Sequence, residues 1–304
     1  MTSLRSVFAL SLGGVLLLTA CGSDAATSDT VPAPATINVI SSGAPLSQLV
    51  GELYGQALEN AGFRIGRKNA VADEPAAYAA VQSGKAQLTA ETTAVLLARV
   101  DPSLTEIPVK VEDQTTAINA KLDKTMAANP TSSVDAGLVV ACTAAAVDEY
   151  TLTDISSLAK VADKVTLGIP EGFDTATPIG LGTITTAYDT SFPTTVTVAA
   201  DGITDAVDKK SFDCVVASGL TPAITISGLL PLTDDKTALP ADIVVPLLGI
   251  AESTPELVSL LTSLNAKLTT EVVRALLVKV EGGNGSYDTV AKAFLASLAD
   301  TSGQ

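Results

Sequence analysis

Side chains that could carry chemistry are few in this chain, and histidine is absent from its 304 residues. Without histidine, a zinc site of the usual His/Cys type and a Ser-His-Asp or Cys-His catalytic set are both close to excluded. Carboxylates occur at Asp234-Asp235 and Glu271, but the sequence places no partner beside them. Neither a P-loop nor a GxGxxG fingerprint is present. We therefore predict that the protein is not an enzyme and holds no metal and no cofactor.

The first of three cysteines follows an apolar N-terminal stretch that carries one positive charge, Arg5. Serine and glycine interrupt the stretch, which falls well short of the roughly 20 apolar residues of a membrane span, so residues 1–20 are predicted to be a signal peptide. The ending Leu18-Thr19-Ala20-Cys21 resembles the lipobox of bacterial lipoproteins, which implies cleavage before Cys21 and a lipid on its thiol. A cysteine that merely lies near an ordinary cleavage site is the alternative. Residues 21–36 lack an apolar period and are predicted to be a lipidated flexible tether.

The remaining chain is acidic and aliphatic. The formal net charge of the full sequence is -15, which makes nucleic acid an unlikely partner because binding it requires a basic face. Hydrophobic residues make up 47% of the chain but aromatic residues only 4%, so the core must consist of Ala, Val, Leu and Ile. After residue 36 no stretch has the length and apolarity of a membrane span. The length suffices for two lobes.

Short apolar runs alternate with segments of helical periodicity along this part of the chain. Ile37 to Ile40 is rich in β-branched residues and is followed by turn residues, and apolar residues then repeat at helical spacing to Ala61. Such alternation predicts an α/β fold of mixed, mostly parallel sheets flanked by helices. Strands are predicted at 37–40, 63–65, 86–89, 137–142, 165–169, 194–198, 213–217 and 243–248, and helices at 46–61, 74–82, 155–161, 178–188, 206–210 and 287–298, with two more that begin at Thr254 and Thr269.

Three segments resemble one protein family in the same order along the chain. Residues 51–63 read GELYGQALENAGF, similar to that family's GELYAQALEAAGY, and residues 155–164 are similar to its TISDLAKVADK. Residues 232–247 are similar to its LEDDK...FP..NVVPLV. The chain thus resembles, from about 37 to 298, the substrate-binding proteins of glycine betaine, choline and osmoprotectant ABC importers.

The resemblance implies a two-lobe periplasmic binding protein fold of type II with two hinge crossovers. Lobe 1 would comprise residues 37–133 plus 245–304, and lobe 2 residues 134–244. The lobes would close on a small solute and deliver it to an ABC permease subunit. The protein would lie on the extracytoplasmic face of the cell membrane, held there by the lipid on Cys21.

The family pattern breaks at the ligand site. Relatives hold a quaternary ammonium in a cage of aromatic faces, but this chain has no Trp, and both tyrosines of the family's YPEYTGT stretch are Thr in residues 89–95. One interpretation is a hydroxyl-lined pocket for a polar, neutral or zwitterionic solute at the carboxyl ends of the strands. The predicted ligand-binding residues are Ser41, Ser42, Glu91, Thr92, Thr93, Phe173, Ser218 and Thr221.

Each of these residues also has a structural interpretation. The hydroxyls would cap helices and satisfy turns, Glu91 would be an acid favoured at a helix N-terminus, and Phe173 would be a core residue. Tyr54 and Tyr78 lie on apolar helical faces and are predicted to be core.

The two other cysteines, Cys142 and Cys214, lie near the end of one predicted strand and near the start of another. In the implied fold these strands run antiparallel, which would place the two cysteines side by side. A disulfide is therefore predicted, with two buried free thiols as the alternative.

Two functions stay open. The first is a solute receptor of an ABC importer, and the second is a lipoprotein with a structural or signalling role that keeps the fold but has lost the ligand.

Overall fold

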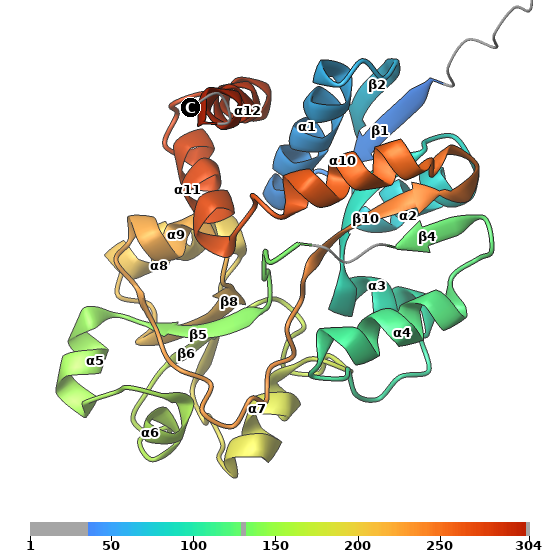
Figure 1. Ribbon diagram of the computed structural model, residues 1–304. Coiled ribbons are helices and arrows are strands. Elements are labelled where there is room, and N and C mark those ends of the chain that lie inside the picture. Colours follow the sequence, from blue (N-terminus) through green and yellow to red (C-terminus); the bar gives the residue numbers. More distant parts are fainter. Residues whose placement is uncertain (1–35, 129–131, 302–304) are drawn as a thin grey trace, which may run out of the picture. The chain divides into compact units, whose positions relative to one another are not determined.

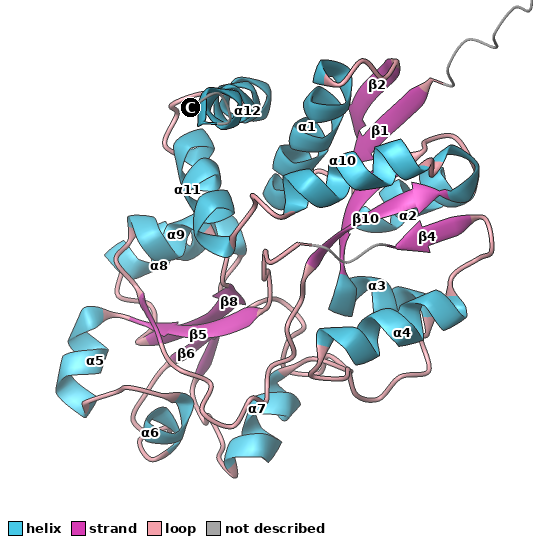
Figure 2. Cartoon of the chain, in the orientation of Figure 1, coloured by secondary structure: helices cyan, strands magenta, loops and turns pink. Residues whose placement is uncertain are grey.

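The computed structural model describes residues 36–128 and 132–301, which contain ten strands and twelve α-helices (Figure 1). The strands form two five-stranded sheets with helices around each (Figure 2). Within the described residues, no helix has both the length and the apolar character that crossing a bilayer requires. The predicted signal peptide, Cys21 and nearly all of the predicted tether lie outside these residues.

The first sheet has the strand order β2-β1-β3-β10-β4. Its pairings β1 with β2 and β1 with β3 are parallel, whereas β10 is antiparallel to both of its neighbours. Four strands therefore run in one direction and β10 runs in the other. The strands are β1 (Ile37–Ser41), β2 (Ile65–Ala70), β3 (Leu88–Thr92), β4 (Met126–Ala128) and β10 (Val244–Gly249).

The second sheet repeats this arrangement in the order β7-β6-β8-β5-β9. Here β5 is the strand that runs against its neighbours. The predicted mixed, mostly parallel α/β architecture is thus confirmed. The strands are β5 (Leu138–Cys142), β6 (Leu167–Ile169), β7 (Thr195–Thr197), β8 (Cys214–Ser218) and β9 (Leu230–Pro231).

Successive strand residues point to opposite faces, and the two faces of each sheet bury different helices. In β10, Val244 and Leu248 join one apolar cluster while Val245 and Leu247 join another. The first cluster packs under α1 (Pro45–Asn60), α10 (Pro255–Asn265), α11 (Thr270–Glu281) and α12 (Tyr287–Thr301), and the second under α2 (Glu74–Gln82), α3 (Thr93–Val100) and α4 (Val111–Lys121).

The same alternation divides the second sheet. Val140 and Val216 belong to one cluster and Ala141 and Val215 to another. The first lies under α5 (Ala144–Tyr150), α6 (Ile155–Ala159) and α7 (Leu181–Tyr188), and the second under α8 (Ile203–Asp208) and α9 (Pro222–Ile226).

Cys142 and Cys214 pair directly across β5 and β8 and form a disulfide. Both are fully buried. The predicted bridge is therefore confirmed, and so is the antiparallel neighbourhood from which it was predicted.

Most predicted elements are present with shifted ends, and several short helices were not predicted. The second strand begins at Ile65 and runs to Ala70 rather than covering 63–65, and β3 covers 88–92 rather than 86–89. Glu91 and Thr92 are therefore strand residues. Helices α3, α4, α5 and α9 are not among the predicted elements, because their apolar positions do not repeat over a long window.

Two crossovers connect the sheets. The described part of the first runs from Ser132 to Gly137 and the second from Leu232 to Ile243. They lie side by side, because Asp135 pairs antiparallel with Ile243 and the Val244 N–H donates to the Val134 carbonyl at 3.0 Å (Figure 1). The predicted boundaries of two lobes fall within or beside these crossovers.

Candidate functional site

The carboxyl ends of β1 and β3 bring together most of the predicted ligand-binding residues. The two strands are parallel neighbours, with Ile40 opposite Thr89, so they end side by side. In open α/β sheets this edge is where ligands bind. Ser41 ends β1 and Thr92 ends β3, while Ser42 and Thr93 begin the loop and the helix that follow.

The hydroxyls after β1 shape a tight turn. The Ser42 N–H donates to the Ser47 hydroxyl at 2.9 Å, and the Ala44 N–H donates to the Ser42 hydroxyl at 3.2 Å. Helix α1 then begins with Pro45 at its first position, where the missing N–H has no cost. Ser42 is only 1% exposed. Its contacts are those of the structural interpretation, in which a serine satisfies a turn.

Glu91 is the buried acid of this edge. The residue is 4% exposed, and its Oε2 accepts from Arg99 Nη1 at 2.8 Å. Arg99 also lies 3.7 Å from the Glu74 carboxylate and 5.4 Å from the ring centre of Tyr78. The other carboxylate oxygen of Glu91 is buried without a hydrogen-bond partner.

Burial raises the pKa of Glu91 to about 7, against the opposing effect of Arg99. An ionised carboxylate in a site of low polarity loses hydration that one hydrogen bond replaces only in part. Because Glu91 lies in β3 and pairs with a side chain on α3, its main contact is this ion pair rather than a helix N-terminus.

Thr92 and Thr93 bind the second crossover. The Thr92 hydroxyl donates to Oδ2 of Asp242 at 2.8 Å, and the Ala94 N–H donates to Oδ1 at 2.7 Å. The Thr93 hydroxyl accepts from the Ile243 N–H at 3.0 Å, and the Thr93 N–H donates to the Ile243 carbonyl at 3.0 Å. Both hydroxyls are therefore already engaged in holding the chain that leads into β10.

Asp242 was not predicted as part of this site. Part of the residue stays exposed to solvent, but burial of its carboxyl raises the pKa to about 6, against the hydrogen bonds from Thr92 and Ala94. The signal available in the sequence was an acid directly before the apolar run 243–248. Such an acid must either lie at the surface, where the strand begins, or accept hydrogen bonds from nearby donors.

Residues of the second sheet do not join this group. The Ser218 hydroxyl donates to the Ala136 carbonyl of the first crossover at 2.7 Å. Thr221 precedes α9, and its side chain makes no capping hydrogen bond. Phe173 is 6% exposed and belongs to the apolar cluster under α6 and α7, so its contacts are those of a core residue.

The cavity at the first-sheet edge is small. It has a volume of about 20 Å³ and is lined by Glu91, Thr92, Ser47, Leu46 and Val244, among others. That volume holds about one water molecule. Glu91, Thr92 and Ser47 thus face one shared space, but in this arrangement the space does not admit a solute.

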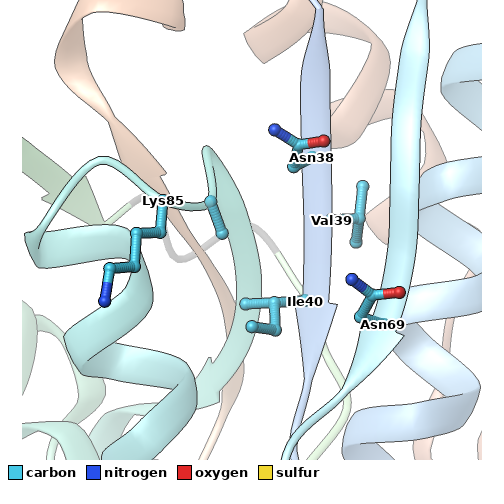
Figure 3. A pocket seen from close by; sticks show the side chains of 6 residues that line it. Asn38, Val39, Ile40, Asn69 and Lys85 are labelled. Atoms are coloured by element: carbon cyan, nitrogen blue, oxygen red, sulfur yellow. The ribbon is translucent and has the colours of Figure 1, made fainter.

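Larger hollows lie elsewhere in the described residues, and two of them border the crossovers and the first sheet. One, of about 490 Å³, runs along the crossovers and is lined by Asp135, Gly219 and Arg274, among others. The other, of about 350 Å³, lies on the first sheet beside Lys85 (Figure 3). It borders the middle of β1 rather than its carboxyl end. The Asn38 amide there is held by Gln87 at 3.1 Å, and Lys85 extends away from Asn69.

Among the described residues, the cations that lie over aromatic rings each face a single tyrosine. Each of the five tyrosines lies on a helix. Tyr54 is fully buried and donates to Asn265 at 3.0 Å, which confirms the prediction of a core residue, and Tyr78 is half-buried beside Arg99. Within residues 36–128 and 132–301, no group of three His, Cys, Asp or Glu side chains could hold a metal ion.

Sequence comparison places the chain in a family. A family model described as the substrate binding domain of the ABC-type glycine betaine transport system matches residues 35–297. The chain belongs to this family. Its members are solute-binding proteins of ABC importers rather than enzymes, with a small-molecule ligand and a permease partner, and they act on the extracytoplasmic side of the membrane. No curated protein matches the sequence.

Solved structures show the same fold. A glycine betaine/carnitine/choline ABC transporter protein is 17% identical, with a TM-score of 0.76 and coverage of 86% of this chain and 98% of that one. Apo YehZ from Escherichia coli is also 17% identical, with a TM-score of 0.70 and the same coverage. Lactococcal OpuAC, closed on glycine betaine, is 15% identical, with a TM-score of 0.56, and the match covers 87% of this chain and 96% of that one. At these identities the likeness concerns the fold, which is that of type II periplasmic binding proteins.

Proposed function

We propose that this family member captures a small polar or quaternary-ammonium solute, of the betaine or choline kind, between two lobes and delivers it to its permease. The observation that carries the proposal is the family match over residues 35–297. The lobes of the proposal are residues 37–133 with 245–304 and residues 134–244, and the hinge is formed by the two crossovers.

The proposed solute contacts come from both sheets. From the first, Ser41, Ser42, Glu91, Thr92 and Thr93 contribute hydroxyls and one buried carboxylate. From the second, Ser218, Thr221 and Phe173 complete the set once the lobes rearrange. Because Glu91 has an unpartnered oxygen, it is the group best placed to meet the positive part of a zwitterionic or cationic solute. The absence of tryptophan favours recognition by polar groups over an aromatic cage.

Calorimetric titration of the purified protein with glycine betaine, choline, carnitine and proline betaine tests this function. We expect saturable binding of at least one solute, a raised melting temperature and a more compact particle by X-ray scattering. At 100 times the dissociation constant, binding would stabilise the protein by about 2.7 kcal/mol. Absence of all three responses for every solute would refute the proposal.

A matched pair of variants locates the site. Glu91→Gln removes the buried charge with little change in shape, and should weaken binding of a solute that carries a positive charge. Lys85→Ala alters the hollow of Figure 3 and should leave binding unchanged. Equal losses in both variants would place the solute elsewhere.

We also propose that the protein is a lipoprotein, with residues 1–20 removed, lipid on Cys21 and residues 22–36 as a tether that keeps the receptor near its permease. Mass spectrometry of the N-terminal peptide and membrane fractionation test this. A Cys21→Ala variant should leave the membrane fraction, whereas unchanged membrane retention would contradict the proposal.

The alternative is a lipoprotein with a structural or signalling role on the same fold. It is favoured by the hydroxyls of Thr92, Thr93 and Ser218, which already bind the crossovers. This alternative predicts no response to any solute in the titration, and no loss of osmoprotectant uptake in cells that lack the protein.

A further inference from the structure

Asp242 occupies a junction between three parts of the chain. Its two carboxylate oxygens accept from the Thr92 hydroxyl at the end of β3 and from the Ala94 N–H in the first turn of α3. Its backbone N–H donates to Oδ1 of Asp135 at 2.9 Å, and its carbonyl accepts from the Ala136 N–H at 2.9 Å. One residue thus links the second crossover to the first crossover and to the junction of β3 and α3 at Glu91, Thr92 and Thr93.

The junction leaves little room for another arrangement of the two crossovers. Asp135 Oδ1 also accepts from the Gly137 N–H at 2.8 Å. A Cβ atom on Gly137 would lie 2.8 Å from that oxygen and 3.2 Å from the Pro240 carbonyl. A side chain at this position would have to displace the Asp135 carboxylate and shift the Pro240 carbonyl, so the two crossovers are closely packed here.

We propose that Asp242 is a positioning residue, which fixes the junction of β3 and α3 at Glu91, Thr92 and Thr93 to the crossovers so that this junction moves together with the hinge. The inference deepens the proposed function, on which its consequence for solute binding rests. Asp242 would not contact solute. Instead, Asp242 would position the side chains that contact solute. Solute capture would thereby be coupled to hinge movement.

The charged groups around Asp242 decide how this contact responds to pH. Asp135 of the first crossover disfavours its ionisation, and Glu91 on β3 is a further acid that interacts with it. Arg99 on α3 is paired with Glu91 instead. A carboxyl whose pKa is raised in the closed contact binds its proton more tightly there than in an opened, hydrated state, so acid favours the closed contact.

Hydrogen exchange of the Ala94 and Val95 amides, both of which interact with the Asp242 carboxyl, tests the proposal in the purified full-length protein. With a pKa of about 6 in the closed contact and 3.8 when it is opened, protection should rise by up to about tenfold from pH 7.5 to pH 5.

Asp242→Asn keeps the acceptor oxygen and should retain protection with a weaker pH dependence. Asp242→Ala removes the acceptor and should lower protection by about tenfold or more. Asp213→Ala is the matched control, because Asp213 accepts from the Thr166 N–H at 2.8 Å in the second sheet, and it should match the wild type at Ala94 and Val95.

Protection in Asp242→Ala equal to that of the wild type would overturn the proposal, as would equal pH dependence in the wild type and Asp242→Asn. If Asp242→Ala does not fold, the pH dependence of protection in the wild type and in Asp242→Asn can still be compared, and that comparison decides the role of Asp242. Titration with glycine betaine and choline then adds the functional arm, where Asp242→Ala should weaken any binding about tenfold and Asp242→Asn should restore it. Wild-type protein that binds neither solute would count against the proposed function, whereas the exchange result decides the role of Asp242 independently.

Discussion

The two sheets solve the same structural problem with different chemistry. In each, one strand runs against its neighbours and is entered from a crossover, β10 in the first sheet and β5 in the second. Strand β10 pairs with β3, and strand β5 pairs with β8. At the end of each pair that is farther from the crossover, the first sheet has Leu248 opposite Leu88, and the second has Cys142 bonded to Cys214. Packing holds one pair and a covalent bond holds the other.

The ends of these strand pairs that lie beside the crossovers differ as well. The last residue of β3, Thr92, donates to the carboxylate of Asp242, and the last residue of β8, Ser218, donates to the carbonyl of Ala136. Each acceptor lies two residues before the antiparallel strand. Equivalent hydroxyls thus hold equivalent crossovers, but of these two contacts only the one in the first sheet uses an acceptor that titrates. The first sheet is therefore expected to respond to pH and the second to reducing agents.

Among the changes that test this comparison, loss of the disulfide should lower the free energy of unfolding the most. The bridge spans 72 residues, and on the chain-entropy model it stabilises the protein by about 4 kcal/mol. Denaturant unfolding of Cys142→Ala/Cys214→Ala should show this loss. The wild type in dithiothreitol should lose a similar amount, and reductant should not affect the double variant. A double variant as stable as the wild type would mean that packing suffices in both sheets.

The pH dependence of stability should come from the first sheet. Burial raises the pKa of Glu91 from 4.5 to about 7. The folded state then binds a proton that the unfolded state releases, so the stability that Glu91 contributes is fully present below pH 4.5 and is lost as the pH rises through about 7. The decrease is about 3 kcal/mol at most. Urea unfolding from pH 5 to pH 8 should show a flatter profile for Glu91→Gln than for the wild type. Identical slopes would show that Glu91 is not the group responsible.

The Thr92 hydroxyl of the first sheet should contribute more to the free energy of unfolding than the Ser218 hydroxyl of the second. Thr92→Val keeps the shape but removes a donor to a carboxylate, and we expect a loss of about 2 kcal/mol at pH 8, where Asp242 is ionised. At pH 5 the loss should shrink, because the carboxyl is then largely protonated. Thermal unfolding at both pH values provides the measurement, and a loss that does not depend on pH would argue against a charged acceptor.

The hydroxyl of the second sheet should show the smallest effect. Ser218→Ala removes a hydrogen bond to a neutral carbonyl, which we expect to cost about 1 kcal/mol at either pH. The same unfolding experiments apply. If Ser218→Ala proved as costly as Thr92→Val, the distinction drawn between the two crossovers would fail.

Local patterns determined much of this fold. Helix α2 has the predicted bounds, 74–82, and in the structure the Asp73 side chain caps its start while Ser83-Gly84 end it. The order of strands and helices and the neighbourhood of Cys142 and Cys214 also followed from the sequence and its resemblance to a family. Strand ends were less accurate, since the polar Glu91 and Thr92 carry no apolar alternation that would extend β3.

The candidate site was only half determined in this way. The sequence by itself indicated which residue types stand at the carboxyl ends of the strands, because these ends follow apolar runs. Only the tertiary structure decided what those side chains bind, because Thr92 and Asp242 are 150 residues apart and meet only when β10 returns beside β3. A hydroxyl looks the same in sequence whether it faces a solute or a crossover. Its partner depends on the long-range pairing of strands, which no local pattern contains.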